Sequence, residues 1–208
     1  MKKILLMICI FIFTTGCTNI NKLNYKDIID TTIKENTDNN LYNRYSNGYK
    51  YYLPKYMNIK ENFNYNEKIN SNDNTYYLYI DIISYYNKKA NKYIETKDYI
   101  NYTFDNGYLK VKEKDNKYLV EITYNYAKIE VIVDKMNLNE AINNSIIILS
   151  TIKYDDKIIE NLIVEDKLNG EAEKLNIFED IEKKDDFMDV IEEYDVYEED
   201  IPDYDKIN

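Results

Sequence analysis

The chain has 208 residues but no histidine and no tryptophan, and only two cysteines, four glycines and two prolines. Without histidine it cannot form a Ser-His-Asp or Cys-His catalytic group, and His-ligated zinc, copper and haem sites are excluded as well. Four glycines do not supply the glycine-rich loop that cradles a phosphate. The sequence therefore predicts neither a cofactor nor a metal, and few enzyme classes remain.

Chemistry that uses carboxylates alone is the main class left. Glycoside hydrolysis, for example, needs two acids on opposite sides of a cleft. Asp81, on a predicted strand, and Glu95, in a polar connection, can be nominated, but nothing around them singles out either residue. We therefore expect a protein that is not an enzyme.

The first seventeen residues are the most informative segment. Two lysines precede ten apolar residues, Ile4 to Phe13, and small residues then lead to Gly16 and Cys17. This order is typical of a secretory signal, and the apolar run is shorter than the roughly 20 residues of a membrane-spanning helix. The segment resembles the type II signal peptide of bacterial lipoproteins. That resemblance implies cleavage after Gly16 and a diacylglycerol on Cys17.

This resemblance predicts where the protein is located. Two acyl chains attach a protein stably to a bilayer without a basic surface patch. We expect the chain on the extracytoplasmic face of a bacterial cell membrane, with its other cysteine, Cys9, removed with the signal. The predicted segments are a signal peptide (1–16), a tether (17–24), a globular domain (25–164) and a tail (165–208).

Charge separates the tail from the domain. From Glu165 onward there are 18 acidic residues and 5 lysines, whereas Cys17 to Val164 carries 20 of each sign. The tail is predicted to be disordered, with one helical pattern at Phe187, Val190, Ile191 and Tyr194 that could bind a partner protein. A net charge of −11 argues against nucleic acid as a partner.

Three predicted turns divide residues 100–134 into an antiparallel meander. The turns are centred on Asn106-Gly107, Asp115-Asn116 and Tyr126-Ala127. The predicted pairs are Phe104 with Leu109, Tyr102 with Val111, Val111 with Val120, Leu109 with Ile122, Ile122 with Val131 and Val120 with Val133. One face of this sheet is apolar. The other is expected to be solvated and carries Lys110, Lys112, Glu121, Thr123, Lys128 and Glu130, with Lys110 opposite Glu121.

Helices are predicted to cover the apolar face. Apolar residues recur at helical spacing from Leu138 to Ile152, with Asn137 and Glu140 as a capping pair, and again from Tyr25 to Asn36. Strands are predicted at Tyr49–Leu53 and Tyr76–Ile83. The sequence thus predicts an α+β fold with one antiparallel sheet and helices mainly on one face. This order of elements loosely resembles the PsbP/Mog1-like fold, a likeness that implies no function.

Two functions remain open. The first is a non-catalytic protein-binding or scaffolding lipoprotein, whose partner contacts the domain or the acidic tail. The second is a receptor for a small molecule or glycan that uses the tyrosine-rich segments Tyr42–Tyr56 and Tyr76–Tyr86, because a tyrosine ring stacks on apolar faces while its hydroxyl bonds polar groups. Most of the 24 tyrosines are nevertheless expected to fill half-buried strand positions.

Overall fold

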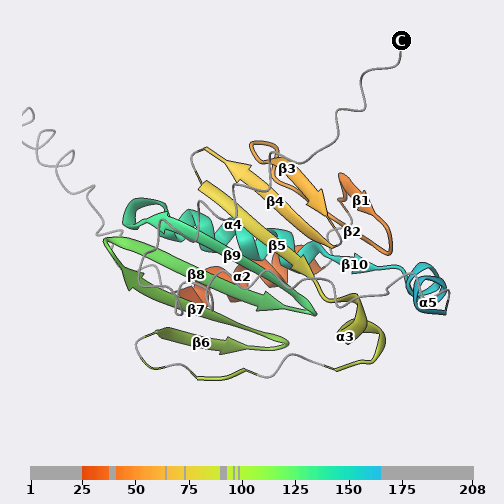
Figure 1. Ribbon diagram of the computed structural model, residues 1–208. Coiled ribbons are helices and arrows are strands. Elements are labelled where there is room, and N and C mark those ends of the chain that lie inside the picture. Colours follow the sequence, from red (N-terminus) through yellow and green to blue (C-terminus); the bar gives the residue numbers. More distant parts are fainter. Residues whose placement is uncertain are drawn as a thin grey trace, which may run out of the picture.

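The computed structural model describes residues 25–37, 41–63, 65–72, 74–89, 93–95, 97 and 99–164 (Figure 1). Its helices are α2 (Tyr25–Thr37), α3 (Ile82–Tyr86), the 3-10 helix η2 (Lys135–Asn137), α4 (Leu138–Thr151) and α5 (Asp156–Val164). Gly16, Cys17 and the acidic tail lie outside the described residues, so the signal, the lipid attachment and the tail stay predictions.

Within the described residues, ten strands form two antiparallel sheets. The larger has the order β3-β4-β5-β9-β8-β7-β6 and the smaller the order β1-β2-β10. The bounds are β1 (Arg44–Ser46), β2 (Tyr49–Tyr51), β3 (Asn58–Phe63), β4 (Asn66–Ser71), β5 (Asn74–Ile80), β6 (Ile100–Phe104), β7 (Gly107–Lys114), β8 (Lys117–Tyr124), β9 (Ala127–Asp134) and β10 (Lys153–Tyr154). The α+β class is confirmed, but a second small sheet accompanies the predicted one.

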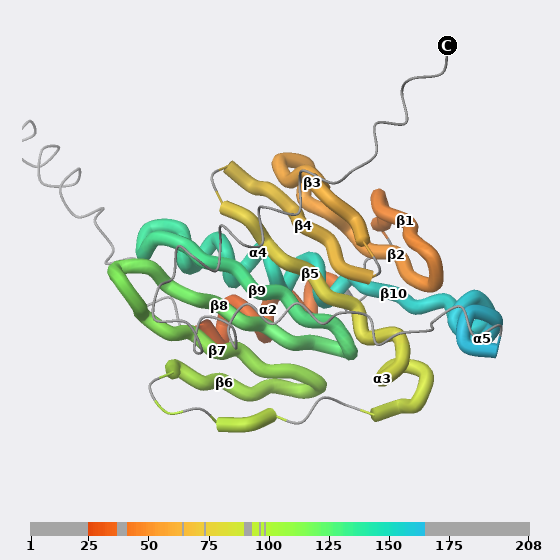
Figure 2. Tube along the Cα trace, in the orientation of Figure 1, coloured from red at the N-terminus to blue at the C-terminus, as the bar shows by residue number. Residues whose placement is uncertain are grey.

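The core lies between the large sheet and α4. Figure 2 shows α4 and α2 together behind that sheet. Ala141, Ile142 and Leu149 of α4 are fully buried, because the helix turns its apolar residues toward β8 and β9. The two helices are also joined by hydrogen bonds, from Thr32 to Asn143 at 3.1 Å and from Asn36 to Ser150 at 3.0 Å. Both predicted helices are confirmed, although the Asn137 side chain makes no capping hydrogen bond.

The middle hairpin of the meander has the predicted register. Val111 pairs with Val120, Leu109 with Ile122 and Lys110 with Glu121. Its turn residues, Asp115 and Asn116, both have a positive φ, of 52° and 64°. Both Asp and Asn tolerate this left-handed backbone better than most residues, so the turn is placed by its own chemistry.

The other two hairpin registers were predicted wrongly, each by two positions. Tyr102 pairs with Leu109, and Ile122 pairs with Ile129. The loops are Asp105-Asn106 and Asn125-Tyr126, one residue earlier than predicted; in the first, only Asn106 has a positive φ, at 64°. Because side chains alternate with period two, a shift of two positions keeps every residue on its predicted face.

Two predicted strands end earlier than expected. β2 ends at Tyr51 rather than Leu53, and β5 ends at Ile80 rather than Ile83. The carboxylate of Asp81 accepts a hydrogen bond from the Ser84 backbone N–H at 2.8 Å and so begins α3. The apolar residues that alternate along β5 continue into α3, so the sequence pattern does not show where the strand ends.

The expected solvated face of the large sheet is largely buried, which corrects the prediction. Glu121, Thr123, Lys128 and Glu130 are each less than a tenth exposed. Their charges are paired, with Lys128 3.0 Å from Glu130 and Lys110 3.9 Å from Glu121. Tyr93 and Tyr99, between α3 and β6, also place rings near Lys110 and Lys112. The alternation of charged residues along the strands does not show in the sequence that other residues lie over this face.

Candidate functional site

An open groove of about 620 Å³ lies between α2 and the β6–β8 end of the large sheet. This volume falls in the range of known ligand sites, about 300 to 1,000 Å³. Its lining residues come from one helix and three neighbouring segments of the meander: Lys26, Asp30, Ile33, Lys34, Tyr102, Phe104, Asp105, Asn106 and Tyr124. We call it the aromatic groove.

Three rings form a row in the aromatic groove. Tyr102 and Phe104 have ring centres 5.8 Å apart and planes 29° apart, and Phe104 and Tyr124 follow at 6.1 Å and 27°. Tyr102 and Phe104 share a face because they are two positions apart on β6. Gly107 lies opposite both Phe104 and Tyr124 in the ladder, so no side chain separates their rings.

Gly107 is required for this packing. A Cβ atom there would lie 2.2 Å from the Thr123 carbonyl oxygen and 2.6 Å from the Phe104 ring. Any other residue would therefore push Phe104 away from the sheet. The row of rings thus depends on a glycine that the sequence had suggested only as a turn residue.

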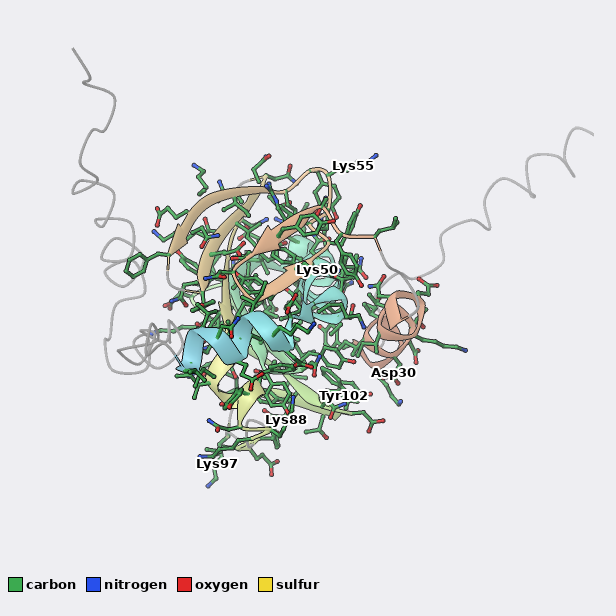
Figure 3. The ribbon with its side chains drawn as sticks, turned by 90° about the vertical axis from the view of Figure 1, so that its right-hand side faces the viewer. Asp30, Lys50, Lys55, Lys88, Lys97 and Tyr102 are labelled. Atoms are coloured by element: carbon green, nitrogen blue, oxygen red, sulfur yellow. The ribbon has the colours of Figure 1, made fainter. Side chains whose placement is uncertain are left out.

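Polar side chains of α2 form the other wall. Lys26, Asp30 and Lys34 are spaced four residues apart, so they share one helix face. The Asp30 carboxylate accepts hydrogen bonds from Lys26 Nζ at 2.6 Å and from the Tyr102 hydroxyl at 3.2 Å. Figure 3 shows Asp30 and Tyr102 close together where α2 meets the sheet. The hydrogen bond to Asp30 raises the pKa of Lys26 above its ordinary value.

A second cluster joins the two sheets. Glu67 of β4 is 1 % exposed, and its carboxylate accepts hydrogen bonds from the hydroxyls of Tyr49, at 2.6 Å, and Tyr51 of β2. Burial raises the pKa of both tyrosines, and the charge of Glu67 raises it further. Each carboxylate oxygen already has a donor and the cluster is closed to solvent. We call it the closed carboxylate cluster and assign it to the fold.

A third cluster ties the helices at one end of the sheet to the β8–β9 turn. Tyr85 of α3 stacks on Tyr154 at 3.9 Å between ring centres and meets Tyr126 edge-on at 5.5 Å. The Tyr85 hydroxyl donates to Asp156 at 2.7 Å, and that of Tyr154 donates to the Asn125 carbonyl at 2.9 Å. Burial raises the pKa of Tyr85 to about 12. These ring contacts and hydrogen bonds are made within the cluster and hold α3 and α5 in place.

The tyrosine-rich segments do not line the aromatic groove. Tyr49, Tyr51 and Tyr76 are buried, whereas Tyr45 and Tyr56 are exposed. Of the acids nominated for catalysis, Asp81 caps α3 and Glu95 is exposed. Among the described residues no three acidic, histidine or cysteine side chains gather as metal ligands.

The sequence did not predict the groove, although it predicted the helix and the meander that line it, with the β6–β7 register two positions off. The helical spacing of Lys26, Asp30 and Lys34 was visible, and so was the alternation of Tyr102 and Phe104 on one strand. No local pattern tells which helix lies over which strand, however. Asp30 and Tyr102 are 72 residues apart in the chain, so only the fold brings them together.

Comparison with protein-family models, with curated proteins and with solved structures finds no match to this chain. The likeness to the PsbP/Mog1-like fold therefore stays a prediction. Within the described part of the chain, no helix has the length and apolar character needed to cross a bilayer.

Proposed function

We propose that this chain is a lipid-anchored, non-catalytic binding protein of the bacterial cell envelope. The charged start, the short apolar run and the Gly16-Cys17 junction support cleavage after Gly16 and acylation of Cys17. The aromatic groove supports the binding role, because it combines apolar rings with polar side chains. It is the observation on which this proposal rests.

A protein partner remains part of this proposal. The groove is one surface for it, and the acidic tail is a second interaction segment through the apolar residues Phe187, Val190, Ile191 and Tyr194. Nucleic acid does not fit, because a chain with a net charge of −11 repels phosphates.

The anchor is tested by the intact mass of protein extracted from membranes. We expect an amino terminus at Cys17 that carries two or more acyl chains, and Cys17→Ala should release the protein from the membrane fraction. A polypeptide that still begins at Met1, or one that begins at Cys17 without acyl chains, would contradict the proposal.

The binding role is tested by photocrosslinking in living cells. A benzophenone amino acid replaces Lys34, at the rim of the groove, or Lys55, an exposed residue distant from Asp30 in Figure 3. Benzophenone inserts into C–H bonds, so it captures proteins and saccharides alike. We expect a discrete adduct from position 34 only. Equal adducts from both positions, or none from position 34, would overturn the binding role.

A further inference from the structure

The geometry points to a ligand class for the aromatic groove: we infer that it binds a neutral carbohydrate chain, whose sugar rings stack on Tyr102, Phe104 and Tyr124 while their hydroxyls bond the polar side chains of α2. This inference rests on the proposed function and names the ligand of the same site.

The row of rings provides a platform for stacking. The three rings are spaced 5.8 and 6.1 Å apart and their planes differ by less than 30° between neighbours. All three are half-buried and pack against the core, which fixes their orientation before any ligand arrives. A rigid row of rings, two of which carry hydroxyls, suits a ligand that itself consists of flat apolar faces edged with polar groups. Linked sugar rings have this form.

The polar wall offers both acceptors and donors. The Asp30 carboxylate is oriented by Lys26 and Tyr102, and its side chain is still 45 % exposed, so it can accept further hydrogen bonds. Lys34 and the Asn106 amide can donate at other points of the lining. A sugar hydroxyl both donates and accepts hydrogen bonds, so it fits a wall of mixed groups better than a ligand that only donates or only accepts.

The charge of the lining selects a neutral ligand. Two lysines, Lys26 and Lys34, balance two aspartates, Asp30 and Asp105. An anionic polymer would meet two carboxylates as well as two lysines, and so gains no net attraction from the lining. The apolar side chains of a peptide would cover charged groups without giving them partners, which is costly. A neutral, hydroxyl-rich chain avoids both penalties.

The test is calorimetric titration of the full-length acylated protein in lipid nanodiscs. The probes are N-acetylated chitohexaose and cellohexaose as neutral chains, a heparin hexasaccharide as an anionic chain, and a neutral phenylalanine-rich peptide. We expect at least one neutral saccharide to bind. Tyr102→Ala should weaken that binding by about tenfold, since it removes both a stacking surface and a hydroxyl from the site. The matched control, Tyr45→Ala, removes a ring that is 73 % exposed on β1 and should leave the affinity unchanged.

Because Tyr102 also packs against the core, Asp30→Asn provides a variant that keeps the rings. It should weaken saccharide binding by about two- to fivefold, since it replaces a charged acceptor with a neutral one. The inference is overturned if neither neutral saccharide binds, if the binding survives Tyr102→Ala and Asp30→Asn unchanged, or if the heparin fragment or the peptide binds more tightly. A groove-specific crosslink without saccharide binding would overturn this inference alone and leave the binding role intact.

Discussion

The closed carboxylate cluster and the aromatic groove are built from the same kinds of residue. In the first, Glu67 accepts hydrogen bonds from two tyrosines and is 1 % exposed. In the second, Asp30 accepts from one tyrosine and one lysine and is 45 % exposed. Each site also has rings side by side, Tyr49 with Tyr51 and Tyr102 with Phe104. The difference between the sites is exposure and remaining hydrogen-bonding capacity.

That difference separates a structural cluster from a candidate binding site. A buried carboxylate stabilises a fold only when its oxygens find donors, and Glu67 has one for each. An exposed carboxylate contributes little to stability and remains able to bond a ligand. Counting tyrosines therefore identifies neither site. The surroundings of each tyrosine decide its role.

The largest effect on stability is expected at alkaline pH, where the buried tyrosines of the closed carboxylate cluster ionise. Burial raises the pKa of Tyr49 and Tyr51 far above their ordinary value of 10.0, and it raises the pKa of Tyr76 to about 12. Above pH 10 the unfolded chain loses these protons while the folded domain keeps them. The unfolded state then binds fewer protons, so stability is intact below pH 10 and falls as the pH rises toward 12.

The expected result is cooperative unfolding that begins above pH 10, with a burst of tyrosinate absorbance at 295 nm at the same pH. Circular dichroism recorded in parallel checks the coincidence. The substitutions Tyr49→Phe and Tyr51→Phe should reduce the absorbance change in the cooperative step. Ionisation of every tyrosine near pH 10 in a domain that stays folded would refute the assignment of these hydroxyls as buried.

Glu67→Ala should have the next largest effect. It leaves the Tyr49 and Tyr51 hydroxyls buried without their acceptor, at a cost of about 1 to 3 kcal/mol each, and it also opens a cavity. We expect the free energy of unfolding in urea to fall by about 3 to 5 kcal/mol. Replacing all three residues with apolar ones, Glu67→Leu with Tyr49→Phe and Tyr51→Phe, should recover part of the loss, because no polar group is then stranded.

The matched control for this experiment is Glu61→Ala. Glu61 pairs with Lys68 at 3.2 Å on the edge of the large sheet, where its side chain is 32 % exposed. It should lose far less stability than Glu67→Ala. A loss of under about 1 kcal/mol for Glu67→Ala would show that the carboxylate does not hold the two sheets together.

The sequence predicted more of the fold than of the site, for a physical reason. The alternation in β7 and β8 and the helical spacing of α4 are local patterns, and they led directly to the sheet face and its cover. The turn at Asp115-Asn116 was placed correctly because both residues favour a positive φ. The turn at Asp105-Asn106 was not, because Gly107 was assigned to the turn tip, whereas it is needed on β7 for the close approach of Phe104.

Neither the closed carboxylate cluster nor the aromatic groove could be predicted in this way. Glu67 meets Tyr49 and Tyr51 because a small sheet packs beside a large one, and the sequence indicated a single sheet. Asp30 meets Tyr102 because the fold brings α2 beside the end strand β6, although 72 residues separate them in the chain. Contacts of this length are set by tertiary packing, which no periodicity within one segment encodes.

Asp30→Asn should have the smallest effect on the stability of the fold, in contrast to Glu67→Ala. We expect no measurable loss in the free energy of unfolding, because the pair that Asp30 forms with Lys26 is open to solvent. The variant should still change the pKa of Lys26. Hydrogen bonding to Asp30 raises the pKa of Lys26 above its ordinary value of 10.5, so removing the charge should lower that pKa toward 10.5.

Titration of the lysine side-chain resonances by NMR checks this prediction. If Asp30→Asn unfolds the domain as Glu67→Ala is expected to do, the aromatic groove is a second structural cluster. If only the titration of Lys26 changes, the Asp30 carboxylate is held in place by its neighbours without supporting the fold, as a ligand site requires.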